Sequence, residues 1–98
     1  MAAITLDVVV VASPNQVSSR LGDDAVILEL EKGAYFGLES VGSRIWELLA
    51  QPRPVSEIRD TIVGEFEVEP DRCAADLLAL LTQMADKGLI QVGSAPAP

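Results

Sequence analysis

The chain has 98 residues, a length that suits one domain with a single modest core and is too short for two. Apolar residues make up 49% of the sequence, which favours a folded globular body over disorder. The formal net charge of −8 at pH 7 disfavours nucleic acid and anionic membranes as partners, because binding to both depends on neutralising phosphates.

The cysteine content and the N-terminal sequence indicate the cellular compartment in which the protein is expected. Cys73 is the single cysteine of the chain, so no internal disulfide can form and nothing points to an oxidising environment. The N-terminus lacks the basic region of a signal peptide, and the apolar run 8–12 is too short to span a bilayer. We therefore expect a cytoplasmic protein with no membrane partner.

Short extended segments are predicted in the first part of the chain. Residues 4–12 are rich in β-branched side chains and end at the Ser-Pro-Asn turn of residues 13–15. Residues 16–21 and 25–30 are joined by the Gly-Asp-Asp sequence 22–24, which is typical of a tight hairpin turn. These segments predict antiparallel strands.

The stretch from Gly33 to Leu38 is a further apolar strand, which follows a turn at residues 31–33 and leads almost directly into a helix. It is expected to pair back on residues 25–30. One side of this strand should contact the core, while its backbone edge stays free to accept another chain. Three or four short strands are thus predicted before the first helix.

Two helices are predicted next. At Ser40 the apolar period becomes helical, and Ser40 itself is a suitable N-cap. The prolines within residues 51–54 end this helix, because proline cannot continue it. A second helix begins near residue 55, and Gly64 with the acidic stretch 65–69 signals its end. Its apolar face comprises Val55, Ile58, Ile62, Val63 and Phe66.

The third predicted helix is the longest. It begins at Pro70, which needs no N–H in a first turn, and Gly88 is a typical C′ residue. Its apolar stripe comprises Cys73, Leu77, Leu80, Leu81 and Met84. Residues 89–92 either return to the sheet or pack beneath it, and residues 93–98 are expected to form a disordered Pro/Ala tail.

The predicted fold is therefore a single α+β domain over residues 1–92. It consists of a small antiparallel three- to four-stranded sheet followed by three helices, and it is similar to a winged helix.

The sequence contains little that could perform chemistry. It has no histidine and no paired cysteines, so a zinc site and most general-base arrangements lack their usual residues. Phosphate-binding loops are absent, and the acidic residues of 23–24 and 65–71 lack the spacing of a calcium loop. Cys73 would need a neighbouring base to act as a nucleophile, and its place on the helical stripe favours a buried thiol. We predict no enzyme, no catalytic residue, no metal and no cofactor.

A winged-helix layout also occurs in DNA-binding regulators, which makes DNA binding an alternative function. A recognition helix needs basic residues to meet phosphates, whereas the third helix offers Asp71, Asp76 and Asp86 against Arg72 and Lys87. DNA binding is therefore supported by analogy of fold alone.

Several stretches resemble the pyrroloquinoline quinone biosynthesis protein D (PqqD) family, which includes the stand-alone recognition proteins of lasso-peptide pathways. The resemblance covers residues 16–92. Its most specific parts are Gly-x-Tyr-Phe-x-Leu at 33–38 running into Val-Gly-x-x-Ile-Trp at 41–46, and Asp-x-x-x-x-Leu-x-x-Met-x-x-x-Gly-Leu at 76–89.

The resemblance implies a RiPP recognition element, a domain that binds the leader of a ribosomally made precursor peptide. Family members add the leader as a strand to a sheet edge, and leader side chains enter the groove between that strand and the third helix. Strand addition of this kind takes affinity from backbone pairing and specificity from side-chain pockets.

Carried onto this sequence, the resemblance gives an edge strand and one flank of the third helix as the peptide-binding site. The strand comprises Ala34, Tyr35, Phe36, Gly37 and Leu38, and the preferred helix flank comprises Arg72, Asp76, Leu80 and Gln83. The opposite flank, Ala75, Leu78 and Thr82, is the alternative. Plain core packing is the competing interpretation for Phe36 and Trp46, and a solvated helix face is the competing interpretation for Arg72 and Asp76.

Two features depart from the family pattern. Glu69 stands where a short capping residue is common, which weakens the cap of the third helix. The run Val8–Val11 is an apolar extension that either forms an extra strand or pairs between two molecules, and the second alternative would support a homodimer.

The sequence thus predicts a non-catalytic leader-peptide binder that presents its precursor peptide to modifying enzymes. A leader peptidase and a cyclase of a lasso-type pathway are the first expectation. The alternative is a peptide chaperone that serves a radical enzyme in pyrroloquinoline quinone biosynthesis.

Overall fold

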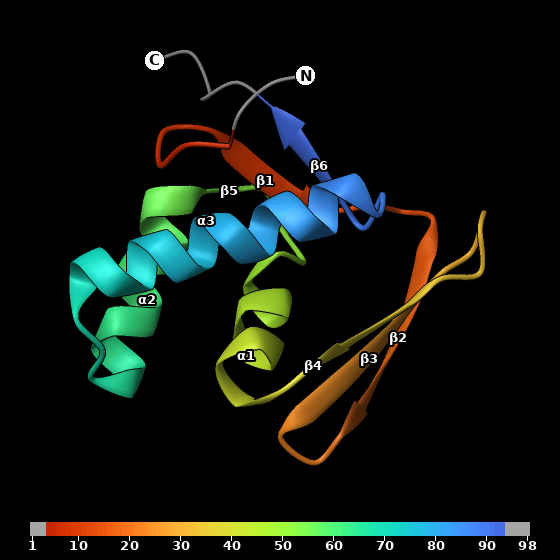
Figure 1. The fold of residues 1–98 in the computed structure, drawn as a ribbon, viewed down its shortest axis with the longest axis horizontal. Coiled ribbons are helices and arrows are strands. Elements are labelled where there is room, and N and C mark those ends of the chain that lie inside the picture. The colour runs from red at the N-terminus through yellow and green to blue at the C-terminus, as the bar shows by residue number, and fades with distance from the viewer. Residues whose placement is uncertain (1–3, 94–98) are drawn as a thin grey trace.

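The computed structural model describes residues 4–93 (Figure 1). Within this range the chain forms six strands and three helices. The strands are β1 (Val9–Ala12), β2 (Gln16–Leu21), β3 (Asp24–Glu29), β4 (Tyr35–Leu38), β5 (Arg53–Pro54) and β6 (Ile90–Gly93). The helices are α1 (Ser40–Leu48), α2 (Val55–Phe66) and α3 (Pro70–Asp86). The predicted α+β class and the three helices are confirmed.

The strands form two sheets where one was predicted. β2, β3 and β4 make one antiparallel sheet in the order β2-β3-β4, and β1 lies between β5 and β6 in the other. Residues 4–8 precede β1 without joining it, so the first predicted strand was too long at its start. Residues 90–93 do return to a sheet, and their partner is β1. In Figure 1 the β1 sheet lies above α3 and the β2-β3-β4 sheet lies below it.

The position of β1 removes the basis for a dimer through the Val8–Val11 run. Val10 pairs with Arg53 on one side and with Val92 on the other, and its side chain is fully buried. Because both edges of this strand are bonded within the chain, they cannot pair with a second molecule without unfolding. Gly93 belongs to β6, so the predicted tail begins one residue too early, and residues 94–98 lie outside the described range.

Two glycine turns build the β2-β3-β4 sheet. Leu21 and Asp24 face each other across a two-residue turn in which Gly22 has a φ of 68°, a conformation that favours glycine. At the next turn Gly33 has a φ of 71°, and its N–H donates to the carbonyl oxygen of Glu29 at 2.9 Å. Glycine in this conformation at the start of a strand is typical of a bulged hairpin.

The helix ends differ in part from the predictions. Ser40 is not the N-cap of α1: Glu39 holds that position without a side-chain cap, and Ser40 has a φ of 37° in the left-handed region. Gly64 does not end α2, which continues to Phe66 before Glu67 turns left-handed with a φ of 54°. A single interior glycine costs helix stability but does not forbid the helix.

The end of α3 follows the prediction closely. Gly88 has a φ of 74°, its N–H donates to Ala85, and the N–H of Leu89 donates to Met84 at 2.9 Å. This is the Schellman arrangement, in which glycine lets the chain leave the helix while the last carbonyls stay bonded. At the other end Pro70 holds the first position and Glu69 makes no side-chain cap, as its type predicted.

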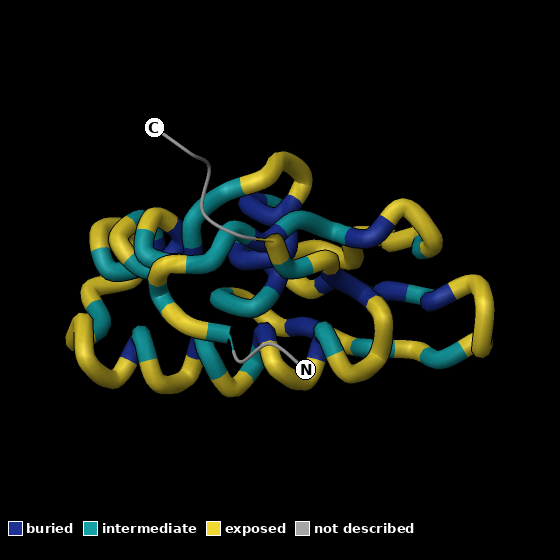
Figure 2. Tube along the Cα trace, turned by 90° about the horizontal axis from the view of Figure 1, so that it is seen from above, coloured by how far each residue is buried: buried dark blue, intermediate teal, exposed yellow. Residues whose placement is uncertain are grey.

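One apolar core joins the helices to both sheets. Figure 2 shows the buried residues gathered inside the molecule and the outer turns exposed. Core packing is confirmed for Trp46 and Cys73, which are buried, whereas Phe36 is half-buried against the core. Fully buried members include Ile27, Leu49, Ile58, Ile62, Leu81 and Met84.

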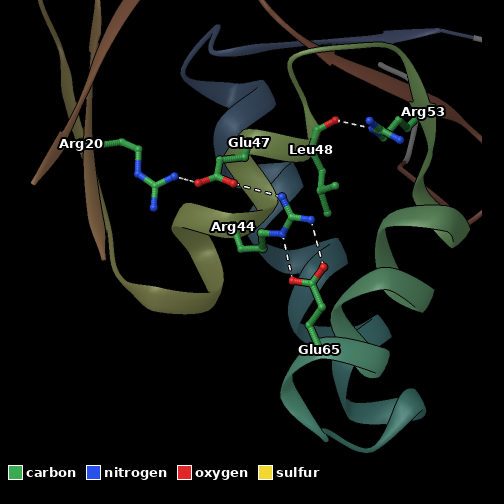
Figure 3. A network of polar contacts seen from close by, with 6 residues as sticks. All are labelled: Arg20, Arg44, Glu47, Leu48, Arg53 and Glu65. Carbon is green, nitrogen blue, oxygen red and sulfur yellow. Dashed lines mark hydrogen bonds and ion pairs between the residues drawn. The ribbon is translucent and has the colours of Figure 1, made fainter. Parts of the chain in front are cut away.

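Ion pairs connect β2, α1 and α2 at the surface (Figure 3). Arg44 in α1 binds Glu65 of α2 through two hydrogen bonds of 2.9 Å and binds Glu47 at 3.0 Å. Arg20 of β2 contacts the other oxygen of Glu47. The hydrogen bonds from Arg44 lower the pKa of Glu65, and Glu65 in turn raises the pKa of Arg44. Arg53 donates separately to the carbonyl oxygen of Leu48 at 2.7 Å, which holds the end of α1.

Candidate functional site

The open edge of β4 is the side of this strand that faces away from β3. Among residues 4–93, β4 pairs with β3 alone and ends its sheet. Phe36 and Leu38 face inward, Leu38 being buried, whereas Tyr35 is 72% exposed on the other face. The prediction that one face of this strand contacts the core while its edge stays unpaired agrees with this geometry.

The hydrogen-bonding phase of β4 determines which residues can pair a further strand. The N–H of Glu29 donates to the carbonyl oxygen of Ala34 at 2.8 Å. Backbone groups of successive residues in a strand point to opposite edges, so those of Phe36 and Leu38 face β3. The N–H and C=O groups of Tyr35 and Gly37 therefore face the open edge.

A groove of about 310 Å³ lies between α3 and the start of α1. On α3 it is lined by Arg72, Asp76 and Leu80, three residues of the predicted flank, together with Cys73 and Leu77. The remaining wall comprises Val41, Gly42, Ile45, Ile62 and Val68. The groove is thus mainly apolar, with one cation and one carboxylate at its rim.

The groove adjoins the end of β4. A Cβ built on Gly42 would lie 3.1 Å from Cδ2 of Leu38, so only glycine lets α1 pack this closely on the strand. At the other end of α3, the Nζ atom of Lys87 lies 6.0 Å from the centroid of the Phe36 ring. β4 thus contacts α1 beside the groove and approaches Lys87 just beyond α3, while none of its own residues lines the groove.

The structure brings some of the predicted site residues together and leaves others apart. Gln83 is exposed on α3 and does not line the groove. Residues of the alternative flank do not line it either, and Thr82 bonds instead to the carbonyl oxygen of Leu78 at 2.7 Å. Arg72 and Asp76 approach to only 3.8 Å, and both side chains are largely exposed, so this pair contributes little to stability.

Sequence reasoning missed the wall that α1 and Val68 contribute. Val41 and Ile45 were recognised as the apolar stripe of a helix, which explains their burial but not the groove. Gly42 carried the available signal, since a glycine inside a predicted helix often marks a close packing contact.

Cys73 lies in the groove wall but is a poor candidate nucleophile. Burial raises the pKa of its thiol, and the nearby Asp76 carboxylate raises it further, against a smaller opposite effect of Arg59. The thiolate, which is the reactive form, is therefore disfavoured at neutral pH. No cluster of three or more metal-ligating side chains occurs in the described part of the chain.

Comparison with known proteins assigns the family. The model of the family described as "Coenzyme PQQ synthesis protein D (PqqD)" matches residues 24–90, which contain β3, β4, all three helices and the groove. This chain belongs to the PqqD family. A comparison with curated protein sequences finds no match.

Two solved structures are similar to this PqqD-family chain. TbiB1, solved in complex with the TbiA(beta) leader peptide, is 41% identical, with a TM-score of 0.75, over 83% of this chain and 94% of TbiB1. The tRNA-dependent lantibiotic dehydratase MibB from Microbispora sp. 107891 is 20% identical, with a TM-score of 0.56, over 87% of this chain and 8% of MibB. The second likeness concerns the fold alone.

The described residues also bear on the membrane. Over residues 4–93, none of the helices has both the length and the apolar character needed to cross a bilayer.

Proposed function

We propose that this chain is a non-catalytic RiPP recognition element in the cytoplasm, which captures the leader of a ribosomal precursor peptide by strand addition. The leader pairs with the open edge of β4, and its side chains enter the groove beside α3. The complex then presents the precursor to modifying enzymes.

The open edge of β4 beside an apolar groove is the observation that carries this proposal. Backbone groups of Tyr35 and Gly37 are available to pair an extended peptide, which gives affinity without regard to sequence. Leu80, with Arg72 and Asp76 at the rim, then selects among side chains. The 41% identity to TbiB1, which was solved with a leader peptide, supports the same interpretation.

The pathway is proposed to be of the lasso type, with a leader peptidase and a cyclase as the enzymes that receive the peptide. The family description favours the alternative, in which the chain serves as a peptide chaperone for a radical enzyme of quinone-cofactor synthesis. The neighbouring genes distinguish these pathways: a leader peptidase with an asparagine-synthetase-like cyclase, or a radical enzyme for quinone assembly.

Titration of the ¹⁵N-labelled chain with the leader of the precursor encoded nearby tests the binding function. We expect chemical-shift changes and slowed amide exchange concentrated at residues 34–38 and 72–83. The amide of Tyr35 should gain more protection than that of Phe36, which already faces β3. Shifts confined to the β1 sheet, or no binding at all, would contradict the proposal.

A duplex-DNA titration at low salt provides the control for the regulator alternative. With a net charge of −8 we expect no affinity for DNA.

A further inference from the structure

A second pocket of about 280 Å³, the β2–α1 pocket, lies between β2 and α1 and shares no lining residue with the groove beside α3. The residues of β2 that line it are Gln16, Ser18 and Arg20. Their register partners on β3 are all buried, so these three side chains lie on the inner face of the sheet. The residues of α1 that line it share one face of the helix and are Ser43, Trp46 and Glu47.

Two polar atoms of this pocket find no hydrogen-bond partner within residues 4–93, namely Oγ of Ser43 and Oε1 of Gln16. Both atoms are shielded from bulk solvent, and Ser43 as a whole is only 2% exposed. Buried polar groups of folded proteins are nearly always bonded, because an unpaired one costs its lost hydration. Two such atoms in one pocket therefore indicate a ligand that supplies their hydrogen bonds.

The charged residues of the pocket are already paired. Arg20 contacts one carboxylate oxygen of Glu47, and Arg44 donates to the other at 3.0 Å (Figure 3). A charged ligand would have to break these pairs or remain unpaired, and both are unfavourable. The ring of Trp46 and three alanines add apolar contacts. The ligand group is therefore uncharged and has a short apolar stem.

The two unpaired atoms ask for different hydrogen bonds. The Oε1 atom of Gln16 only accepts, whereas the hydroxyl of Ser43 can also donate. A carboxamide satisfies both with separate atoms, since its N–H donates to Gln16 and its oxygen accepts from Ser43. One water takes up about 30 Å³, so the pocket holds a group of several heavy atoms. This chemistry matches the side chain of asparagine or glutamine.

The open edge of β2 runs beside this pocket. Within residues 4–93, β2 pairs with β3 alone and ends its sheet, as β4 does on the other side. The N–H of Leu30 donates to the carbonyl oxygen of Asn15 at 3.0 Å, so the backbone groups of Val17 and Ser19 also face β3. Those of Ser18, between them, face the open edge. An extended segment paired here places alternate side chains over the inner face, toward the pocket.

We infer that the β2–α1 pocket is a second binding site for the precursor peptide, and that it takes the carboxamide of an asparagine or glutamine from a segment that follows the leader. This segment pairs with the open edge of β2 while the leader pairs with the open edge of β4. The inference rests on the proposed function. It adds a site, its ligand chemistry and the part of the precursor that fills it.

Tethering is the reason to choose the precursor itself as the occupant. A small pocket with two hydrogen bonds binds a free peptide weakly, whereas a short flexible linker raises the local concentration of a tethered segment to about the millimolar range. Strands added at the two edges would lie about 19 Å apart, a span that about six extended residues can cover. The stretch between the two strands is then held as a loop, where modifying enzymes can reach it.

The test compares the leader alone with the full-length precursor encoded nearby, each added to the ¹⁵N-labelled full chain. Amide exchange of Ser18 reports pairing at the open edge of β2, and that of Ser19, which faces β3, is the internal reference. Ser43→Ala and Gln16→Leu each remove one of the unpaired polar atoms. Ser19→Ala is the matched control, because it removes a serine hydroxyl from the other face of β2. Fluorescence polarisation measures both affinities.

We expect the full precursor to slow exchange of the Ser18 amide and to bind at least about threefold more tightly than the leader alone. Ser43→Ala and Gln16→Leu should remove both effects and leave leader affinity unchanged, whereas Ser19→Ala should retain them. By circular dichroism, Ser43→Ala should melt no lower than the native chain, since it removes a buried polar atom that has no partner within the described residues.

The outcomes separate the second site from the proposed function. If the native chain binds the leader but the full precursor neither protects Ser18 nor binds more tightly, the second site is wrong, leader binding stands and internal water satisfies the two atoms. Protection of Ser18 that persists in Ser43→Ala and Gln16→Leu would exclude a carboxamide in the pocket. So would a precursor without asparagine or glutamine after its leader. Failure of the native chain to bind the leader overturns the proposed function itself.

Discussion

Tyr35 and Gly37 present their backbone N–H and C=O groups to the same open edge of β4, while Phe36 between them turns its own toward β3. The phase follows from the hydrogen bond of 2.8 Å between the N–H of Glu29 and the carbonyl oxygen of Ala34. A change to the backbone groups of Tyr35 or Gly37 therefore affects leader pairing, whereas a change to those of Phe36 affects the pairing of β4 with β3.

Gly37→Pro tests pairing at this edge. Proline removes an N–H that faces away from β3 and puts its ring where a leader strand would lie, so the β3–β4 hydrogen bonds survive. We expect leader affinity to fall at least about tenfold, since a lost hydrogen bond of about 1 kcal/mol adds to the steric block. Fluorescence polarisation with labelled leader measures the loss.

Gly37→Ala is the matched control for this variant. It keeps the N–H, and its Cβ meets no atom within 4 Å, so leader affinity should stay near that of the native chain. Equal losses of leader affinity in Gly37→Pro and Gly37→Ala would show that the leader does not pair with the backbone edge of β4.

Leu80→Ala tests which flank of α3 contacts the leader. Leu80 and Leu78 are both half-buried leucines of α3, but only Leu80 lines the groove. We expect Leu80→Ala to weaken leader binding about tenfold, as for an apolar anchor in a groove, and Leu78→Ala to change it less than about twofold. Isothermal titration calorimetry of both variants measures this, and the reverse order would place the leader on the other flank.

Cys73 should react slowly with thiol reagents at neutral pH. Its pKa is raised by burial and by Asp76, so little thiolate is present, and the residue is only 8% exposed. We expect N-ethylmaleimide to modify the native chain at pH 7 much more slowly than the urea-unfolded chain, as followed by mass spectrometry. Because Cys73 lines the groove, bound leader should slow the reaction further, and rapid modification of the loaded chain would argue against groove occupancy.

The Arg44–Glu65 pair predicts a specific dependence of stability on pH. Hydrogen bonds from Arg44 lower the pKa of Glu65 in the folded chain, so its contribution to stability is complete above the ordinary pKa of a glutamate. It is then lost as pH falls through the lowered value. Urea unfolding of the native chain and of Glu65→Gln should therefore give free energies that differ at pH 7 and converge at acidic pH. If the difference in the free energy of unfolding persists at acidic pH, packing of the Glu65 side chain would explain it instead of the ion pair.

Removal of residues 1–12 should unfold the chain rather than change its oligomeric state. The deletion removes the central strand of the β5-β1-β6 sheet and exposes the pocket of Val10, whose burial alone is worth about 2 kcal/mol. Thermal unfolding by circular dichroism and size-exclusion chromatography test this. If the truncated chain stays folded and changes only from dimer to monomer, the result would instead support the hypothesis that β1 pairs between two molecules.

Much of the architecture was predictable because the ends of helices and the turns between strands depend on residues that are close together in the sequence. The change of apolar period at Ser40 predicted the start of α1, and Pro70 and Gly88 predicted both ends of α3. Gly22 and Gly33 likewise marked the hairpin turns, since few other residues adopt their backbone conformation. The edge strand, predicted over 34–38 and observed as β4 from Tyr35 to Leu38, was also evident from local sequence, although Ala34 lies just before it and its carbonyl faces β3.

Other features required contacts between distant segments. Nothing in the Val8–Val11 run indicates that its partners are Arg53–Pro54 and Ile90–Gly93, because β-branched residues favour a strand without specifying which strand pairs with it. The groove arises where residues 41–45, 62, 68 and 72–80 converge, so its flank and volume could not be read from the period of α3 alone. Periodicity and turn chemistry act over a few residues, whereas sheet membership and cavities follow from the packing of the whole core, and for this reason they emerged only from the folded structure.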